Sequence, residues 1–166
     1  MDGVVHEILG KWDLIIAHPP CTYISNAGAA RLYKRFNDKS YVELERFEKG
    51  WTARQFFKAC LYADCDHVAV ENPTPSGVFH LPKQTQIIQP YEFGHPYTKR
   101  TCLWLRGLNK LNPTNIVKPL GPWVCGNSEI WKKQGANGTV YGKEKDARHR
   151  SLTFWGVAQA MAEQWG

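Results

Sequence analysis

Residues 12–17, WDLIIA, form a short apolar run that stops at His18-Pro19-Pro20. Prolines cannot continue a hydrogen-bonded ladder, so this run predicts a short buried strand that ends there. A second apolar run, residues 67–70, leads into Glu71-Asn72-Pro73 in the same way. Apolar residues recur at helical spacing between the two runs, from residue 41 to about 63. Strand, helix and strand of this length indicate a βαβ unit, whose two strands are parallel.

The ends of the predicted helix also carry sequence signals. Ser40 and Glu43 fit a capping box, with Ser40 as the N-cap, and Gly50 is a weak point inside the helix. The preceding residues 18–39 are polar and aromatic, and we expect a long loop with a helical turn near residues 29–33. Long ordered loops of this kind are usually functional.

The rest of the chain predicts a second group of strands and a closing helix. We expect loop at 74–84, strands at 85–89 and 101–105, mostly loop from 107 to 150, and a helix at 154–165. The helix has one apolar face, made of Val157, Ala160, Met161 and Trp165. The prediction is one α/β domain over residues 1–166, with two parallel strands, a C-terminal pair of strands, long loops and a C-terminal helix.

Composition and charge narrow the class of protein. The chain has 166 residues, 43% of them apolar and 22% charged, which is ordinary for a globular domain. A formal charge of +6 favours a polyanionic partner such as DNA or a nucleotide, although a merely basic surface has the same charge. No run of about 18 apolar residues and no apolar signal core occur, so we expect a cytoplasmic protein. The five cysteines lack a CxxC pair, which argues against a disulfide framework or a zinc site.

Three segments in order carry the most specific signal. They are Pro19-Pro20-Cys21, Glu71-Asn72-Pro73, and residues 91–101, YEFGHPYTKRT, which lead into the strand CLWL. This order resembles the DNA cytosine-C5 methyltransferases, with their Pro-Cys loop, Glu-Asn motif and Gly-x-Pro-Gln-x-Arg-x-Arg segment. It is more similar still to the phage-borne relatives of that family, which also end in an Ala-Met-Ala-Glu-Gln-Trp-like helix. The resemblance implies a partial Rossmann-like, methyltransferase-like sheet of three layers, in a protein of the bacterial host cytoplasm.

The resemblance also implies roles for individual residues. Cys21 would be the nucleophile that adds to C6 of cytosine, which makes C5 reactive toward a methyl donor. Glu71 would face N3 and the amine of the flipped base, and Asn72 would orient the base or the loop. Cys21 and Glu71 follow adjacent parallel strands, whose carboxyl ends meet at one edge of a sheet. A structural cysteine and a simple turn are the alternatives for these positions.

Further residues are candidates for substrate binding. The third segment keeps Gly94 and Pro96 of the family pattern but has Tyr97, Lys99 and Thr101 where Gln and two Arg are expected. Lys99 offers a cation without the planar fork of arginine, and Arg100 is a candidate substitute. His18, next to the prolines, is either a neighbour that tunes Cys21 or a structural histidine. The full set of candidate substrate-binding residues is Pro20, Asn26, Asn72, Pro73, His95, Tyr97, Lys99 and Arg100, and no metal site is expected.

The sequence lacks the motif that would bind a methyl donor. The resemblance implies S-adenosylmethionine, held on a glycine-rich turn, but no GxGxxG-like turn occurs in this sequence. The strand at 12–17 should then lie at a sheet edge, where unpaired backbone groups invite pairing. We expect a homodimer joined there, a separate donor-binding subunit, or a covering strand from residues 1–10. Three functions remain open: a cytosine-C5 methyltransferase, a protein that binds or sequesters a nucleotide or single-stranded DNA, and a different transferase or hydrolase that uses Cys21.

Overall fold

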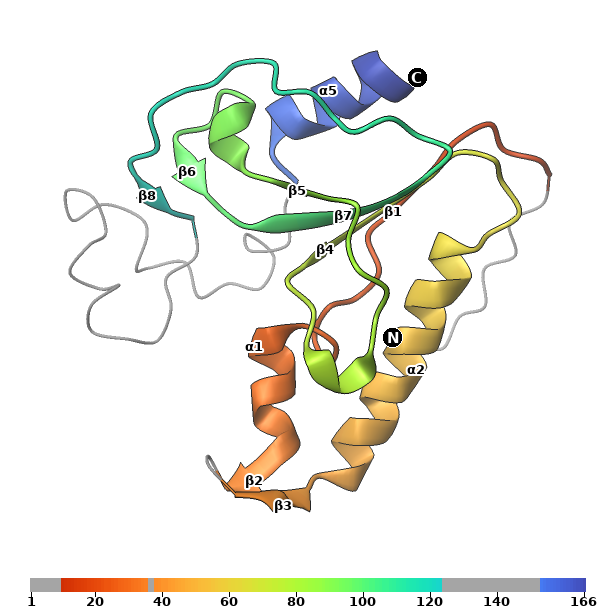
Figure 1. Ribbon diagram of the computed structural model, residues 1–166, viewed down its shortest axis with the longest axis vertical. Helices are drawn as coiled ribbons and strands as arrows, with labels where there is room; N and C mark the ends of the chain where they lie inside the picture. Colours follow the sequence, from red (N-terminus) through yellow and green to blue (C-terminus); the bar gives the residue numbers. More distant parts are fainter. Residues whose placement is uncertain (1–9, 36–37, 124–152) are drawn as a thin grey trace.

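The computed structural model of the chain describes residues 10–35, 38–123 and 153–166. Its centre is a mixed sheet of four strands in the order β1 (Ile15–Ala17), β4 (Val68–Pro73), β7 (Thr101–Arg106) and β5 (Gln86–Ile88) (Figure 1). Strands β1 and β4 are parallel, and β7 is antiparallel to both β4 and β5. The predicted parallel pair and the predicted C-terminal pair of strands are therefore confirmed, and the two pairs join in one sheet.

Two helices cover opposite faces of this sheet. Helix α2 (Leu44–Leu61) buries Ala53, Phe57 and Leu61 against the side chains of β4 and β7 on one face. Helix α5 (Trp155–Trp165) buries Val157, Ala160 and Met161 against β5 and β7 on the other. Successive strand residues point to opposite faces, so Cys102 and Trp104 of β7 join the α2 side while Leu103 joins the α5 side. The result is a layered α/β arrangement of helix, sheet and helix (Figure 1).

The start of α2 differs from the sequence prediction. The helix begins at Leu44, and its N-cap is Glu43, whose side chain makes no capping hydrogen bond. The predicted N-cap, Ser40, lies in strand β3 (Asp38–Val42), which pairs antiparallel with β2 (Tyr33–Arg35). The capping-box prediction was wrong because the segment before the helix joins a ladder, which satisfies backbone groups that a cap would otherwise have served.

The loop predicted at 18–39 contains regular structure. Helix α1 (Asn26–Ala29) and the 3-10 turn η1 (Ala30–Leu32) follow the Pro-Pro-Cys segment, and strand β2 comes next. The expected helical turn is therefore present but begins at residue 26. Further short elements are η2 (Gly77–Phe79), η3 (Pro90–Glu92) and the parallel pair β6 (Tyr97–Thr98) and β8 (Gly121–Pro122). Residues 124–150 of the predicted loop and residues 1–9 of the predicted covering strand lie outside the described residues.

Gly50 is a packing position and not a weak point of the helix. A Cβ atom built on Gly50 would lie 2.1 Å from Cζ of Phe79, so the ring of Phe79 occupies the space that a side chain would need. Helix α2 continues through this residue without interruption. The glycine thus allows η2 to approach the helix closely, at the usual cost in helix propensity.

No helix among the described residues is long and apolar enough to cross a membrane.

Candidate functional site

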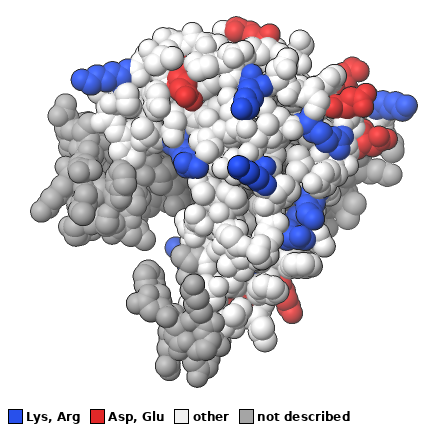
Figure 2. Space-filling view, in the orientation of Figure 1, with Lys and Arg blue, Asp and Glu red and all other residues white. Residues whose placement is uncertain are grey.

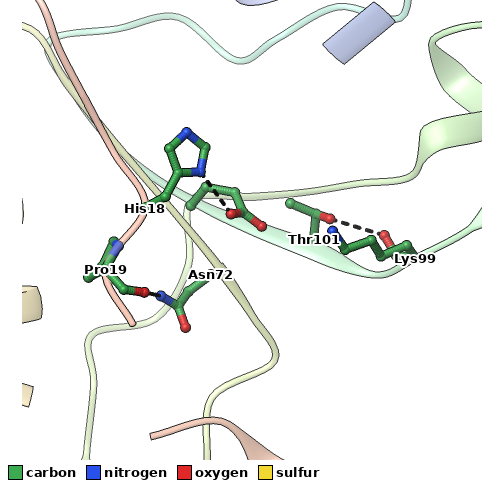
Figure 3. Close-up of polar contacts among 6 residues, drawn as sticks. His18, Pro19, Asn72, Lys99 and Thr101 are labelled. Carbon is green, nitrogen blue, oxygen red and sulfur yellow. Dashed lines mark hydrogen bonds and ion pairs between the residues drawn. The ribbon is translucent and has the colours of Figure 1, made fainter. Parts of the chain in front are cut away.

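The loop that follows β1 is fixed to β4 by a buried amide. Asn72, which is 2% exposed, donates a hydrogen bond from Nδ2 to the carbonyl oxygen of Pro19 over 2.8 Å (Figure 3). The backbone N–H of Ser25 also donates to the carbonyl oxygen of Cys21 over 3.0 Å. These contacts hold Cys21 just beyond the carboxyl end of β1, beside the parallel strand β4. Asn72 therefore supports the loop, one of the two roles predicted for it.

Helix α2 supports the same loop through Arg46. Its Nη2 atom donates to the carbonyl oxygens of Gly28 over 2.9 Å and Thr22 over 3.3 Å. Its guanidinium also lies 4.9 Å from the ring centroid of Tyr23. Arg46 thus fixes both ends of the segment that follows Cys21, a role that sequence reasoning missed because no local pattern links residue 46 to the loop.

Glu71 points to the α5 side of the sheet, opposite to Asn72, as strand alternation requires. Its side chain is largely buried, and its Oε2 atom lies 3.0 Å from Nδ1 of His18 (Figure 3). The loop after β1 therefore makes two contacts with β4, His18 with Glu71 and Pro19 with Asn72. His18 orients the carboxylate of Glu71. The sequence had indicated Cys21 as the neighbour of His18.

Lys99 supplies a positive charge to this region. Burial lowers the pKa of Lys99 below its usual value, while the negative charges of Glu71 and Cys21 act to raise it. Its backbone N–H donates to Oε1 of Gln89, and its carbonyl oxygen accepts from Oγ1 of Thr101 (Figure 3). The side chains of Lys99 and Glu71 line the same small cavity.

A small cavity lies next to these charges. Glu71, Lys99 and Thr101 line it together with Phe154, and its volume of about 10 Å³ has room for about one water molecule. Two other candidate site residues, Cys21 and Asn26, do not line this cavity, so it contains only part of the candidate set. Phe154 also lines a second, larger cavity beside it.

The second cavity has a volume of about 300 Å³ and aromatic walls. Its lining residues are His95, Tyr97, Trp123, Thr153, Phe154 and Trp155, and they are called the aromatic cavity below. The ring of Phe154 has its centroid 5.0 Å from that of His95, 6.0 Å from Tyr97 and 5.2 Å from Trp123. Nε2 of His95 also accepts a hydrogen bond from the backbone N–H of Gly156 over 3.0 Å, which fixes the start of α5.

The remaining candidates lie around this centre. Pro20 is exposed beside Cys21, and Pro73 ends β4 opposite Thr101. Asn26 is exposed at the start of α1, where its backbone N–H bonds to Thr74.

Arg100 does not line the small cavity. Burial raises the pKa of the Cys102 thiol, while a hydrogen bond with Thr74 and the charge of Arg100 lower it, so Arg100 lies near Cys102 on the α2 side. Lys99, on the side of Glu71, is the cation of the small cavity.

The basic surface is dispersed. Lys and Arg side chains are scattered over the face in Figure 2 and do not merge into one patch. The sequence also contains a basic cluster that lies outside the described residues, made of Lys143, Lys145, Arg148, His149 and Arg150.

The described residues do not fit a donor site of the family type. The described glycines with positive φ are Gly10, Gly94 and Gly107, and none of them follows β1 or β4 into a helix. Both parallel strands instead run into prolines, Pro19 after β1 and Pro73 at the end of β4. No group of three or more His, Cys, Asp or Glu side chains arranged to hold a metal ion occurs within residues 10–35, 38–123 and 153–166.

Comparisons with protein-family models, with curated proteins and with solved structures find no match to this chain. The function of this chain is therefore inferred from the chemistry of its site.

Proposed function

We propose that this chain is the base-binding part of a DNA cytosine-C5 methyltransferase-like protein with a partial Rossmann-like sheet, and that it binds cytosine in DNA or in a nucleotide. The observation that carries the proposal is that Glu71 and Lys99 line one small cavity, while Asn72, next to Glu71 on β4, holds the loop that carries Cys21. Open α/β sheets place their binding sites at the carboxyl ends of their strands. A nucleophile, a carboxyl group and a cation are the three groups that covalent activation of a pyrimidine uses.

The chemistry assigns one step to each group. The thiolate of Cys21 adds to C6 of cytosine, the electron pair of the C5–C6 double bond forms a C4–C5 double bond, and the electron pair of the N3–C4 double bond moves onto N3. The protonated form of Glu71 gives its proton to N3, where the negative charge develops, and its other oxygen accepts a hydrogen bond from the amine. His18 orients this side chain through Oε2. The ammonium of Lys99 stabilises negative charge on the nucleophile before addition. C5 then behaves as an enamine carbon and takes up a proton from water or a methyl group from a donor.

The small cavity must widen before cytosine can reach Glu71. A cavity of about 10 Å³ does not hold a base, so the ring of Phe154, which forms one wall, must turn aside when cytosine reaches Glu71. Phe154 is the residue just before α5 and is partly exposed, so its ring can shift to widen the small cavity while it remains the wall between the two cavities.

A methyl donor would be S-adenosylmethionine, as in the family, and the described residues offer no site for it. Strand β1 is an edge strand of the described sheet, and its residue Ile16 is exposed. A second copy of the chain or a separate donor-binding subunit, paired with this edge, is the partner that the proposal requires for methylation. Addition of the thiolate to C6 does not depend on that partner.

The test is release of tritium from C5 of [5-³H]cytosine in single-stranded DNA, with no methyl donor present. Addition of the thiolate at C6 lets C5 take up a proton from water. Loss of tritium from C5 to water and elimination of the thiolate from C6 then restore cytosine. We expect release by the wild-type protein, none by Cys21→Ser, and reduced release by Glu71→Gln. Cys60→Ser is the matched control, because Cys60 is also partly buried but lies on α2. Equal release by wild type and Cys21→Ser would refute the nucleophile.

A second candidate function is binding without catalysis, as in a protein that sequesters a nucleotide or masks DNA. It is favoured by the absence of a donor site among the described residues. The same assay separates the two functions when it is combined with calorimetry. Tight binding of cytosine-containing DNA with no tritium release would identify the binding protein.

A further inference from the structure

The aromatic cavity contains features that the chemistry at Glu71 does not use. Three of its rings, Tyr97, Trp123 and Phe154, form one cluster, with a centroid distance of 4.9 Å between Tyr97 and Trp123. Its volume of about 300 Å³ is at the lower end of the range of about 300–1,000 Å³ found for small-molecule sites. Trp155, at the first residue of α5, lines it while remaining 74% exposed. Such an exposed tryptophan offers its surface to a ligand at the opening.

The chemistry of the walls selects a planar ring as the ligand. Aromatic faces bind either cations or the faces of other π systems. A cationic ligand is disfavoured, because the ammonium of Lys99 lies 5.8 Å from the ring centroid of Phe154 and the described residues of the lining include no Asp or Glu. The net charge of +6 also favours an anionic ligand. A nucleobase attached to a phosphate satisfies both conditions, since base stacking on aromatic side chains tolerates any base.

The position of the aromatic cavity connects it to the proposed target base. Thr153 and Phe154 line both cavities, so a ligand in one lies next to a ligand in the other. Neighbouring bases on one strand lie about 3.4 Å apart when stacked and farther apart when the strand is stretched. A ring inserted between two bases needs about twice the stacking distance of 3.4 Å, a spacing that a stretched single strand can reach.

We propose that the aromatic cavity holds the base adjacent to the target cytosine on the same single strand of DNA, stacked on Tyr97, Trp123 and Phe154. This inference rests on the proposed function, because it places the target cytosine at Glu71. It adds a substrate class, single-stranded DNA read as two consecutive nucleotides. The ring of Phe154 separates the two bases and contacts both.

The test uses three hexanucleotides whose remaining positions are abasic, with binding measured by calorimetry. The first carries cytosine followed by adenine, the second only the cytosine, and the third only the adenine. We expect the first to bind about 5- to 150-fold more tightly than the second, which is the range that stacking of one base provides. Trp123→Ala should abolish this gain and leave the affinity for the second oligonucleotide unchanged.

Two further variants keep the result interpretable. Trp155→Ala removes an exposed side chain with little effect on folding and should reduce the same gain. Trp51→Ala is the control, because Trp51 is also exposed but lies on α2. The proposal is overturned if adenine adds no affinity to the wild-type protein, or if the gain survives both Trp123→Ala and Trp155→Ala.

The three oligonucleotides also separate this proposal from the proposed function. Binding of the adenine oligonucleotide that depends on Trp123, with no contribution from cytosine, would refute the cytosine site and leave the stacking site standing. Binding of the cytosine oligonucleotide that depends on Glu71, with no contribution from adenine, would have the opposite meaning. Equal affinity of all three oligonucleotides and a fully abasic strand would refute both.

Discussion

Replacement of Asn72 by alanine removes the amide that joins the Pro-Pro-Cys loop to β4. The carbonyl oxygen of Pro19 loses a 2.8 Å hydrogen bond in a buried environment. A buried acceptor left without its partner costs about 1–3 kcal/mol. We therefore expect Asn72→Ala to lower the free energy of unfolding by about 2 kcal/mol. For a chain of this size that corresponds to a decrease in Tm of about 4–8 °C.

Urea unfolding monitored by circular dichroism measures this loss, with two companion variants. Asn72→Asp keeps the shape of the side chain but replaces the donor by an acceptor that faces the Pro19 carbonyl, so it should destabilise at least as much as alanine. Asn26→Ala is the matched control, since Asn26 is exposed, and it should change the stability by less than about 0.5 kcal/mol. Values for Asn72→Ala and Asn72→Asp within that same margin of the wild type would refute the loop-support role.

Three further variants test the core and the charges. Phe57→Ala should cost about 3–5 kcal/mol in denaturant unfolding, whereas its neighbour Phe56→Ala should cost under about 1 kcal/mol, because Phe57 is 0% and Phe56 48% exposed; equal costs would contradict the assigned face of α2. Gly50→Ala, which normally favours a helix, should lower Tm because the ring of Phe79 occupies the space of the new methyl group. Burial lowers the pKa of Lys99 from 10.5, so between the folded and unfolded pKa values the unfolded chain binds more protons and stability rises with pH. We therefore expect Lys99→Met to be more stable than the wild type at neutral pH, and this difference in unfolding free energy to shrink as pH rises into the alkaline range. Unfolding curves measured at a series of pH values test this. A difference that stays constant with pH would contradict the buried charge.

Much of the sheet could be predicted from local pattern. Apolar runs before prolines predicted the existence of β1 and β4, and their parallel pairing followed from the helix between them. The bounds differ, because β1 covers only Ile15–Ala17 of the predicted 12–17 and β4 continues beyond the predicted residue 70 to Pro73. The face of α5 was also predictable, because Val157, Ala160 and Met161 recur at helical spacing and are buried. Register, capping and the β2–β3 ladder were not predictable, since they depend on which distant segments compete for the same backbone hydrogen bonds.

For the candidate site, the positions of the residues could be predicted from the sequence but their contacts could not. Cys21, Glu71 and Asn72 could be placed at strand ends from the sequence, because strand direction fixes where each end lies. The contacts that these residues make could not be predicted from the sequence. Strand alternation turns Glu71 toward Lys99 and Asn72 toward the loop, and this depends on which face each helix covers. The place of Phe154 between the two cavities depends on how α5 docks, which no neighbouring residue indicates.

The sequence by itself determined the parallel strands β1 and β4, the helix between them, the C-terminal helix, and the residue types available for chemistry at the strand ends. These are local properties, set by apolar periodicity and by the backbone limits of proline. Only the tertiary structure decided that Asn72 supports the Pro-Pro-Cys loop, that His18 pairs with Glu71, and that an aromatic cavity adjoins Lys99. Each of these contacts joins side chains far apart in the chain, and packing alone selects which of them meet.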